Sequence, residues 1–258
     1  MIPFELVDTG DIPGGGQLRL MRRGDEFSIL FGPETLMGSR ARGSEEALAT
    51  LGCQRMPNPE GRVLIGGLGM GFTLGAALAT LPPTATIVVA ELVPKVVAWA
   101  RGPLAHLFGG SLDDPRVTLA TQDVHDVIES SKGGFDAILL DVDNGPDGMI
   151  HPANDRLYCN WGLRAAYAAL RPGGVLAVWS AYTDNAFMDR LEDTGFEVNE
   201  VTVRASGARK GARHTIWLAV RSSTRAQASV IEKGNRRGKV AVARKRYAAD
   251  ALRRSSSV

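Results

Sequence analysis

Five short apolar segments alternate with helix-like segments through the middle of the chain, and this order constrains the fold more than any other feature. The segments are RVLIG (62–66), TIVVAEL (86–92), VTLAT (117–121), FDAILLD (135–141) and GVLAVWS (174–180). Strands that are apolar on both faces and separated by helices form a parallel sheet with helices covering both faces. The sequence therefore predicts an α/β fold.

The segments around these strands complete the predicted architecture. Helix-like spacing covers 72–81, 94–107, 124–130, 156–170 and 185–194. The strands expected at 196–203 and 214–220 are joined by a short basic loop, which suits an antiparallel pair at the sheet edge. Strands at 17–23 and 26–31 predict an N-terminal hairpin, and Ser44 is a plausible N-cap for the helix after it. We therefore predict a seven-stranded, doubly wound, Rossmann-like sheet with a small N-terminal β-hairpin extension.

Charge divides the chain unevenly. Residues 222–258 hold ten Lys and Arg against two Asp and Glu, a charge of +8, whereas the whole chain carries +2. We expect a hairpin extension (1–43), a core (44–221) and a basic, disordered tail (222–258). The tail could contact nucleic acid or an anionic membrane. A solvated tail with no dedicated partner is the favoured interpretation, because charge runs usually have none.

Composition predicts a cytoplasmic protein. Cys53 and Cys159 form no CxxC pair and no disulfide framework, which fits a reducing compartment. No apolar run reaches the length of about 18 residues that a membrane span needs. The first residues lack a basic flank followed by an apolar core, so no secretory signal is expected.

A glycine-rich turn follows the first core strand. Gly67, Gly69 and Gly71 give the spacing GxGxG, which lets the backbone bend sharply and lets a ligand approach closely. Ligands bind beyond the carboxyl ends of such strands. Phe72 stands where the dinucleotide fingerprint GxGxxG needs a small residue, and no phosphate loop is present. The alternative is that the glycines serve tight strand–helix packing.

Acidic residues at the next two strand ends indicate what the turn holds. Glu91 ends the second strand, where a carboxylate can accept hydrogen bonds from both ribose hydroxyls. Asp123 follows the third strand and could accept from an adenine amino group, while Leu92 and Val124 flank the place of a purine ring. Either acid could instead be a helix N-cap. Together they predict an adenosine pocket without a phosphate site, which means S-adenosylmethionine or a relative.

The fourth strand end, DVDNGPDG, would face the reactive carbon of such a ligand. Asp141 is the candidate for orienting the acceptor and taking its proton; the alternative is a structural cap. Further candidates for the acceptor site are Asp143, Asn144, His151 and Tyr158. Trp161, next to them, is expected to pack in the core.

These features resemble the spermidine synthases, the aminopropyltransferases within the class I S-adenosylmethionine-dependent methyltransferase superfamily. The resemblance runs from about Gln17 to Val220 and rests on SEEALATL, VLIGGLGMG, DDPRV, TQDVHDVI, FDAILLDVDNGP and RLYCNWGLRAAYAALRPGGVLAV. It implies that Glu91 holds ribose, Asp123 holds adenine and Asp141 is the catalytic carboxylate. It also implies an amine acceptor and is compatible with a homodimer.

Three positions depart from the family pattern. Met70 replaces the aspartate of the glycine loop, and Ser44-Glu45-Glu46 replaces Tyr-x-Glu, keeping the acid at Glu46 but not the tyrosine. The family's Asp-Ser-Ser-Asp-Pro reads DVDNGP. Without the loop aspartate, the amides of 69–71 would be free to bind the carboxylate of S-adenosylmethionine. We therefore expect methyl transfer to a small-molecule acceptor; the alternative is aminopropyl transfer from decarboxylated S-adenosylmethionine.

Two other classes of protein are alternatives. A metal-assisted O-methyltransferase would use Asp184-Asn185, but Asp184 is better explained as a helix N-cap, so no metal is expected. A non-catalytic nucleoside-binding or RNA-associated protein would use the basic tail. Its binding to nucleic acid would need a continuous basic surface on the core, whose composition is net acidic.

Overall fold

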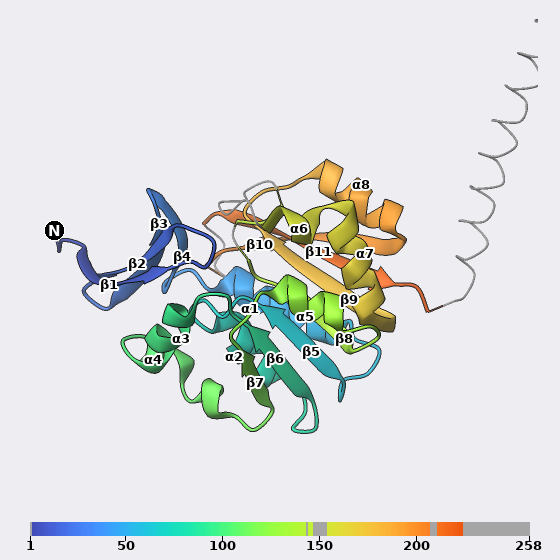
Figure 1. Ribbon diagram of the computed structural model, residues 1–258, viewed down its shortest axis with the longest axis horizontal. Coiled ribbons are helices and arrows are strands. Elements are labelled where there is room, and N and C mark those ends of the chain that lie inside the picture. Colours follow the sequence, from blue (N-terminus) through green and yellow to red (C-terminus); the bar gives the residue numbers. More distant parts are fainter. Residues whose placement is uncertain (1, 143, 147–153, 207–210, 224–258) are drawn as a thin grey trace, which may run out of the picture. The chain divides into compact units, whose positions relative to one another are not determined.

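The computed structural model describes residues 2–142, 144–146, 154–206 and 211–223 (Figure 1). The chain divides into two compact units, Met1–Ser222 and Ser223–Val258, and all described elements lie in the first. Almost all of the predicted basic tail lies outside the described residues, so its expected disorder stays a prediction.

A seven-stranded sheet forms the centre of the first unit. Its strand order is β10-β11-β9-β8-β5-β6-β7. The strands from β5 to β9 pair in parallel, whereas β11 pairs antiparallel with both β9 and β10. Their bounds are β5 Arg62–Gly66, β6 Thr86–Ala90, β7 Val117–Ala120, β8 Phe135–Leu140, β9 Leu170–Ser180, β10 Phe196–Arg204 and β11 Arg213–Arg221. The predicted α/β sheet with an antiparallel pair at its edge is confirmed.

Alternate side chains of the parallel strands enter two separate cores. Val63 and Ile65 of β5 pack into one cluster, and Leu64 between them packs into the other. Successive side chains of a strand point to opposite faces, so a strand that is apolar throughout needs cover on both. The first cluster includes Leu48 of α1 and Leu74 of α2. The second includes side chains of α5, α7 and α8.

The helices follow the predicted order. Their bounds are α1 Gly43–Gln54, α2 Phe72–Thr80, α3 Pro94–Arg101, α4 Ala105–Phe108, α5 Val124–Ser130, α6 Asp155–Tyr158, α7 Asn160–Ala169 and α8 Asn185–Thr194. The helix predicted over 94–107 is divided after Arg101, because Pro103 cannot donate a backbone hydrogen bond and restricts the residue before it. The helix predicted over 156–170 is divided at Cys159, whose backbone is extended.

Two predicted N-caps have different outcomes. Asp184 caps α8, since its carboxylate accepts a hydrogen bond from the amide of Phe187 at 3.0 Å. Ser44 is not an N-cap, because α1 begins one residue earlier, at Gly43. The Gly43 amide donates to the carbonyl of Ala205 at 2.7 Å, so a carbonyl of the turn after β10 satisfies this end of the helix instead.

A four-stranded antiparallel sheet precedes the core, in the order β1-β2-β3-β4. Its strands are β1 Glu5–Asp11, β2 Gln17–Arg23, β3 Glu26–Phe31 and β4 Glu34–Gly38. The predicted hairpin is β2 and β3, the central pair. Leu18, Leu20, Phe27 and Ile29 point from this pair into the first hydrophobic cluster. These apolar side chains join the N-terminal sheet to the α/β core.

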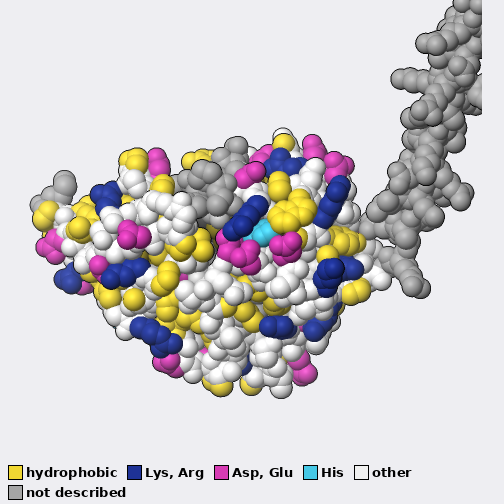
Figure 2. Space-filling view, viewed as in Figure 1, with side chains coloured by type: hydrophobic (Ala, Val, Ile, Leu, Met, Phe, Trp, Pro, Cys, Tyr) yellow, Lys and Arg dark blue, Asp and Glu magenta, His cyan; other side chains and the backbone are white. Residues whose placement is uncertain are grey.

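The surface of the described part bears on the membrane and nucleic-acid alternatives. Figure 2 shows basic and acidic side chains interspersed over the face in view, with no continuous basic area there. Among the described residues, no helix is long and apolar enough to cross a membrane.

Candidate functional site

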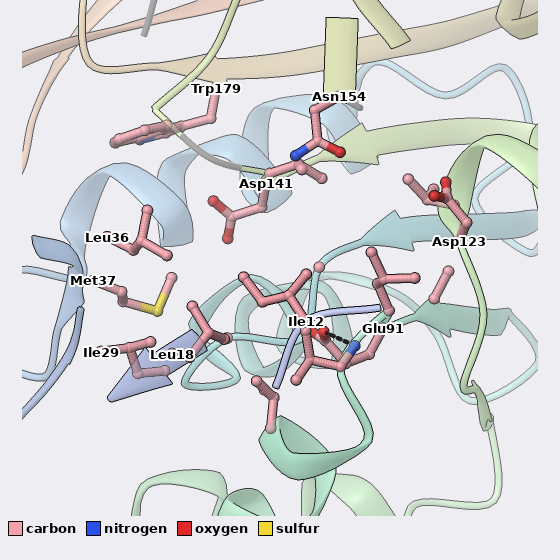
Figure 3. Close-up of a pocket in the computed structure, with 18 of the residues that line it drawn as sticks. Ile12, Leu18, Ile29, Leu36, Met37, Glu91, Asp123, Asp141, Asn154 and Trp179 are labelled. Carbon is pink, nitrogen blue, oxygen red and sulfur yellow. Dashed lines mark hydrogen bonds between the residues drawn. The ribbon is translucent and has the colours of Figure 1, made fainter. Parts of the chain in front are cut away.

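One cavity lies at the carboxyl ends of the parallel strands. Gly67 after β5, Glu91 after β6, Asp123 after β7 and Asp141 after β8 all line it. Figure 3 shows the Asp141 side chain pointing into this cavity, with Leu36 and Met37 on one side and Asp123 on the other. The structure thus brings together the three acids that the sequence placed at successive strand ends.

Two glycines of the turn do different work. Gly67 has φ of +89°, and a Cβ there would stand 2.3 Å from the carbonyl oxygen of Asp141. Only glycine allows the two strand ends to approach so closely. Gly71 does not line the cavity, and a Cβ on it would meet the ring of Phe108 at 2.4 Å. Gly69, between them, lines the cavity. Gly67 and Gly71 therefore both serve close packing, while Gly67 and Gly69 line the cavity.

The amides of the glycine turn already have acceptors. The Met70 amide donates to the sulfur of Met37 at 3.2 Å, and the Gly71 amide donates to the carbonyl of Leu68 at 2.9 Å. The Gly69 amide acts on the Glu91 carboxyl, whose pKa it lowers. The Met70 side chain is fully buried in the core. The expectation that these amides are free to bind a carboxylate is therefore wrong.

Glu91 is a buried acid that lines the cavity and also supports its walls. Its Oε2 accepts from the Leu68 amide at 2.9 Å, and its Oε1 accepts from the Val93 amide at 2.8 Å. Burial raises the pKa of this carboxyl, and the amide hydrogen bonds oppose that rise. Leu92, beside it, also lines the cavity.

Asp123 combines both of its predicted positions. It is the N-cap of α5, because its Oδ1 accepts from the His125 amide at 2.8 Å. It also lines the cavity together with Val124. Its other oxygen forms an ion pair with Arg156, which lies on α6. Nothing in the sequence pattern pointed to Arg156.

Asp141 belongs to a pair of neighbouring acids, of which Glu45 is buried and Asp141 is partly buried. Its Oδ2 accepts a hydrogen bond from the Thr73 hydroxyl at 2.6 Å. Burial raises the pKa of Asp141 to about 6, against the opposing effect of Thr73. Glu45 of α1 lines the same cavity, and its pKa is raised to about 7, first by burial and then by the charge of Asp141. Two adjacent acids with few neutralising partners make this part of the cavity suited to a cation.

Apolar side chains from the N-terminal sheet form another wall of the cavity, on the side of Asp141. Leu18 of β2, Ile29 of β3 and Met37 of β4 line the cavity together with Trp179 of β9. Figure 3 shows these side chains on the opposite side of Asp141 from Asp123. The alternating pattern of β2 and β3 predicts the hairpin, but nothing in the sequence indicates that the hairpin borders the cavity.

The other predicted acceptor residues that the structure describes do not line this cavity. Glu46 pairs with Arg42 at 3.2 Å instead of lining it. Tyr158 is buried, and its hydroxyl donates to the carbonyl of Val142 at 3.0 Å. Asn144 does not line the cavity, although its carbonyl accepts from the Ala181 amide. Asp143 and His151 lie outside the described residues.

Trp161 does not pack in the core, contrary to expectation. Its side chain is 52% exposed, and its ring lies 4.6 Å from that of His125. In the part of the chain that the structure describes, no three His, Cys, Asp or Glu side chains are grouped so that they could hold a metal ion.

Comparison with known families places the chain in one of them. Residues 42–191, more than half of the chain, match the family described as the spermine/spermidine synthase domain. The chain belongs to this family.

The matches to individual relatives cover only part of this chain and a smaller part of each relative. A polyamine aminopropyltransferase of Mycobacterium tuberculosis is 36% identical over 115 residues, which are 43% of this chain and 21% of the relative. Polyamine aminopropyltransferase 2 of Pseudomonas aeruginosa is 32% identical over 120 residues, 45% of this chain and 32% of the relative. The matches thus span about a fifth to a third of these relatives.

Solved structures share the fold. The spermidine synthase of Thermotoga maritima superposes with a TM-score of 0.67 at 19% identity, covering 85% of this chain and 73% of that one. A spermidine synthase solved with the transition-state analogue AdoDATO matches with the same values.

The family match corrects the expected reaction. Methyl transfer was the main prediction, because Met70 replaces the aspartate of the glycine loop. The matching family and the curated relatives are polyamine aminopropyltransferases, not methyltransferases. The physical argument also failed, since the amides near Met70 are occupied.

Proposed function

We propose that this chain binds decarboxylated S-adenosylmethionine and transfers its aminopropyl group to an amine. The observation that carries the proposal is the pair of acids, Glu45 and Asp141, in one cavity with Glu91 and Asp123. Both substrates of such a reaction carry ammonium groups, which this pair can stabilise. Among the described residues that line the cavity there is no lysine or arginine.

Decarboxylated S-adenosylmethionine also fits the glycine turn better than S-adenosylmethionine does. The amino-acid arm of S-adenosylmethionine ends in a carboxylate, which would need free donors near Met70. The Met70 and Gly71 amides are occupied, and Glu45 and Asp141 would repel the added charge. The missing loop aspartate is therefore compensated by Glu45, which reaches the cavity from α1.

The adenosine end follows from the strand-end acids. Glu91 would accept hydrogen bonds from the ribose hydroxyls through the carboxylate oxygens that also accept from backbone amides. Asp123 would receive the adenine amino group, with Leu92 and Val124 beside the ring. For this, the Arg156 ion pair must share or release one carboxylate oxygen.

The reaction asks little of the protein beyond position and one proton acceptor. Decarboxylated S-adenosylmethionine supplies a sulfonium, from which a neutral thioether leaves as the amine attacks the aminopropyl carbon. The amine must be unprotonated to attack. Asp141, held by Thr73, would accept its proton, and a pKa near 6 leaves the carboxylate ready to do so at neutral pH.

Product analysis tests this function. Purified protein is incubated with decarboxylated S-adenosylmethionine and a panel of amines that includes putrescine, and the products are identified by mass spectrometry. We expect 5′-methylthioadenosine and an amine extended by one aminopropyl group, with Asp141→Asn lowering turnover roughly 10²–10⁴-fold. Thr50→Ala, which removes a hydroxyl bonded only within α1, is the matched control. Failure to release 5′-methylthioadenosine with any amine would contradict the proposal.

A further inference from the structure

A hydrogen-bonded chain leads from the cavity acid Glu45 to a histidine. The Ser44 hydroxyl lies 2.6 Å from Oε2 of Glu45 and 2.9 Å from Nδ1 of His214. Ser44 is fully buried and Glu45 is 6% exposed, whereas His214 is only half-buried. Three groups that can each give and take a proton therefore connect the cavity with a more exposed position.

The fold, not sequence proximity, brings these groups together. Ser44 and Glu45 lie in the first turn of α1, and His214 lies at the start of β11, 170 residues from Ser44. The Gly43 amide fixes this end of α1 by donating to the carbonyl of Ala205 at 2.7 Å. The His214 ring also packs edge-on against Trp179, with the ring centroids 4.7 Å apart. Since Trp179 lines the cavity, the histidine lies directly behind its wall.

Burial shifts the pKa values of the two ends of the chain, Glu45 and His214, in opposite directions. Burial raises the pKa of Glu45, with Asp141 and Glu46 adding to the rise, and burial lowers the pKa of His214. The nearest basic side chains are engaged elsewhere. Arg42 pairs with Glu46, and Arg204 of β10 donates to the Gly211 carbonyl. Arg213 precedes the histidine on β11.

We propose that Ser44 and His214 form a proton relay that carries the proton released by the acceptor amine from Glu45 to solvent. The proposal rests on the proposed function and adds to it a route for the proton. Ser44 and His214 act through Glu45 and do not touch the reacting atoms, so both are positioning residues.

Each step of the relay conserves its protons. The acceptor ammonium gives a proton to the Asp141 carboxylate and becomes an amine, and Asp141 passes this proton to the neighbouring Glu45 carboxylate. Glu45 then donates this proton to the Ser44 oxygen as Ser44 donates its own hydroxyl proton to Nδ1 of His214. The imidazolium that results loses the proton on Nε2 to water. The hydroxyl suits the central place because it is both donor and acceptor.

A histidine titration tests the coupling without any assay of activity. Full-length protein labelled with ¹³C and ¹⁵N in histidine is titrated by NMR, and His214→Gln identifies the His214 signals. We expect the His214 ring shifts to show a second inflection near pH 7, where Glu45 titrates. This inflection should vanish in Glu45→Gln and in Ser44→Ala and should remain in Thr50→Ala, the matched control. A His214 curve that is the same in all four proteins would overturn the proposal.

Kinetics then separate the relay from a structural role. With decarboxylated S-adenosylmethionine and an amine, Ser44→Ala and His214→Gln should lower kcat roughly tenfold, while KM changes less than about twofold. The loss should depend on pH, whereas a merely structural defect would lower kcat equally at every pH. A pH-independent loss, or none, contradicts the relay. If no turnover occurs with any protein, the proposed function fails, and the NMR titration still decides whether the three groups are coupled.

Discussion

Glu91 accepts hydrogen bonds from two segments that line the cavity, and it is also proposed to hold the ribose. A substitution can separate these two roles. Glu91→Gln keeps the size of the side chain but replaces one acceptor oxygen with a donor. We expect the affinity for the adenosine ligand to fall about ten- to hundredfold, because a charge-assisted hydrogen bond is worth roughly 1.5–3 kcal/mol. Calorimetric titration with 5′-methylthioadenosine measures this. Glu129→Gln, on an exposed position of α5, is the control. Unchanged affinity in Glu91→Gln would remove Glu91 from the ribose site.

The acid pair should make stability depend on pH. The carboxyls of Glu45 and Asp141 have pKa values of about 7 and about 6 in the folded chain, above their ordinary values of 4.5 and 3.8. The folded state therefore binds these protons more tightly than the unfolded state does. Their contribution to the free energy of unfolding is fully present below about pH 4 and is lost as the pH rises to about 7.

Substitution of one acid isolates this effect. Glu45→Gln cannot ionise, so it should be more stable than wild type at pH 8, and this advantage should be smaller at pH 5. Urea unfolding at the two pH values measures the difference. Glu46→Gln, whose side chain is 43% exposed, should change the free energy of unfolding by less than about 0.5 kcal/mol at both. If Glu45→Gln gains nothing at pH 8 relative to pH 5, the acids do not form the pair described.

The same helix shows why Glu46, predicted for the acceptor site, does not line the cavity. Family motif spacing selected Glu46, but the buried face of α1 follows Glu45, Leu48, Ala49, Gly52 and Cys53. Neighbouring positions of a helix are rotated by about 100°, so Glu45 faces the cavity and Glu46 does not. The apolar periodicity of α1 is visible in the sequence and distinguishes Glu45, which lines the cavity, from Glu46, which does not.

At the scale of elements, the side chain of Asp136 connects three neighbouring strands of the seven-stranded sheet. It is buried on β8, accepts from the Arg62 amide of β5 at 2.8 Å and pairs with Arg171 of β9. Asp136→Ala should lower the free energy of unfolding by about 2–3 kcal/mol, because it leaves a buried amide and a cation without their acceptor.

The control for this prediction is an exposed acid. Asp113→Ala breaks the pair with Arg101, in which both side chains are more than half exposed, and should cost less than about 0.5 kcal/mol. Urea unfolding compares the two variants. Equal effects would show that Asp136 does not join the three strands.

The sequence predicted the strands and helices more reliably than it predicted which of them lie beside the cavity. The parallel strands are apolar throughout, so their pattern alone identifies them and their double cover. β1 and β4 were missed because their sequences, ELVDTGD and ETLMG, show no clear alternation of apolar and polar residues. The position of the N-terminal sheet beside the cavity depends on contacts distant in sequence, such as that between Met37 and Met70. No local pattern contains that information.

For the molecule as a whole, the sequence predicted the family, but the main prediction of methyl transfer is contradicted by the family match. The argument from Met70 treated the glycine turn as if only its own residues determined its charge. In the folded chain, Met37 occupies an amide of that turn and Glu45 supplies negative charge from another helix. Both contributions come from the packing of separate elements around one cavity.

The choice between the two forms of S-adenosylmethionine tests this account most directly. Both are titrated calorimetrically against the same preparation, at a pH above 7 where Glu45 and Asp141 are ionised. The cavity should bind the decarboxylated form at least about tenfold more tightly, a difference of about 1.4 kcal/mol. The reason is that the extra carboxylate of S-adenosylmethionine would meet two acids and occupied amides. Equal or tighter binding of S-adenosylmethionine would contradict the assignment of this cavity to aminopropyl transfer.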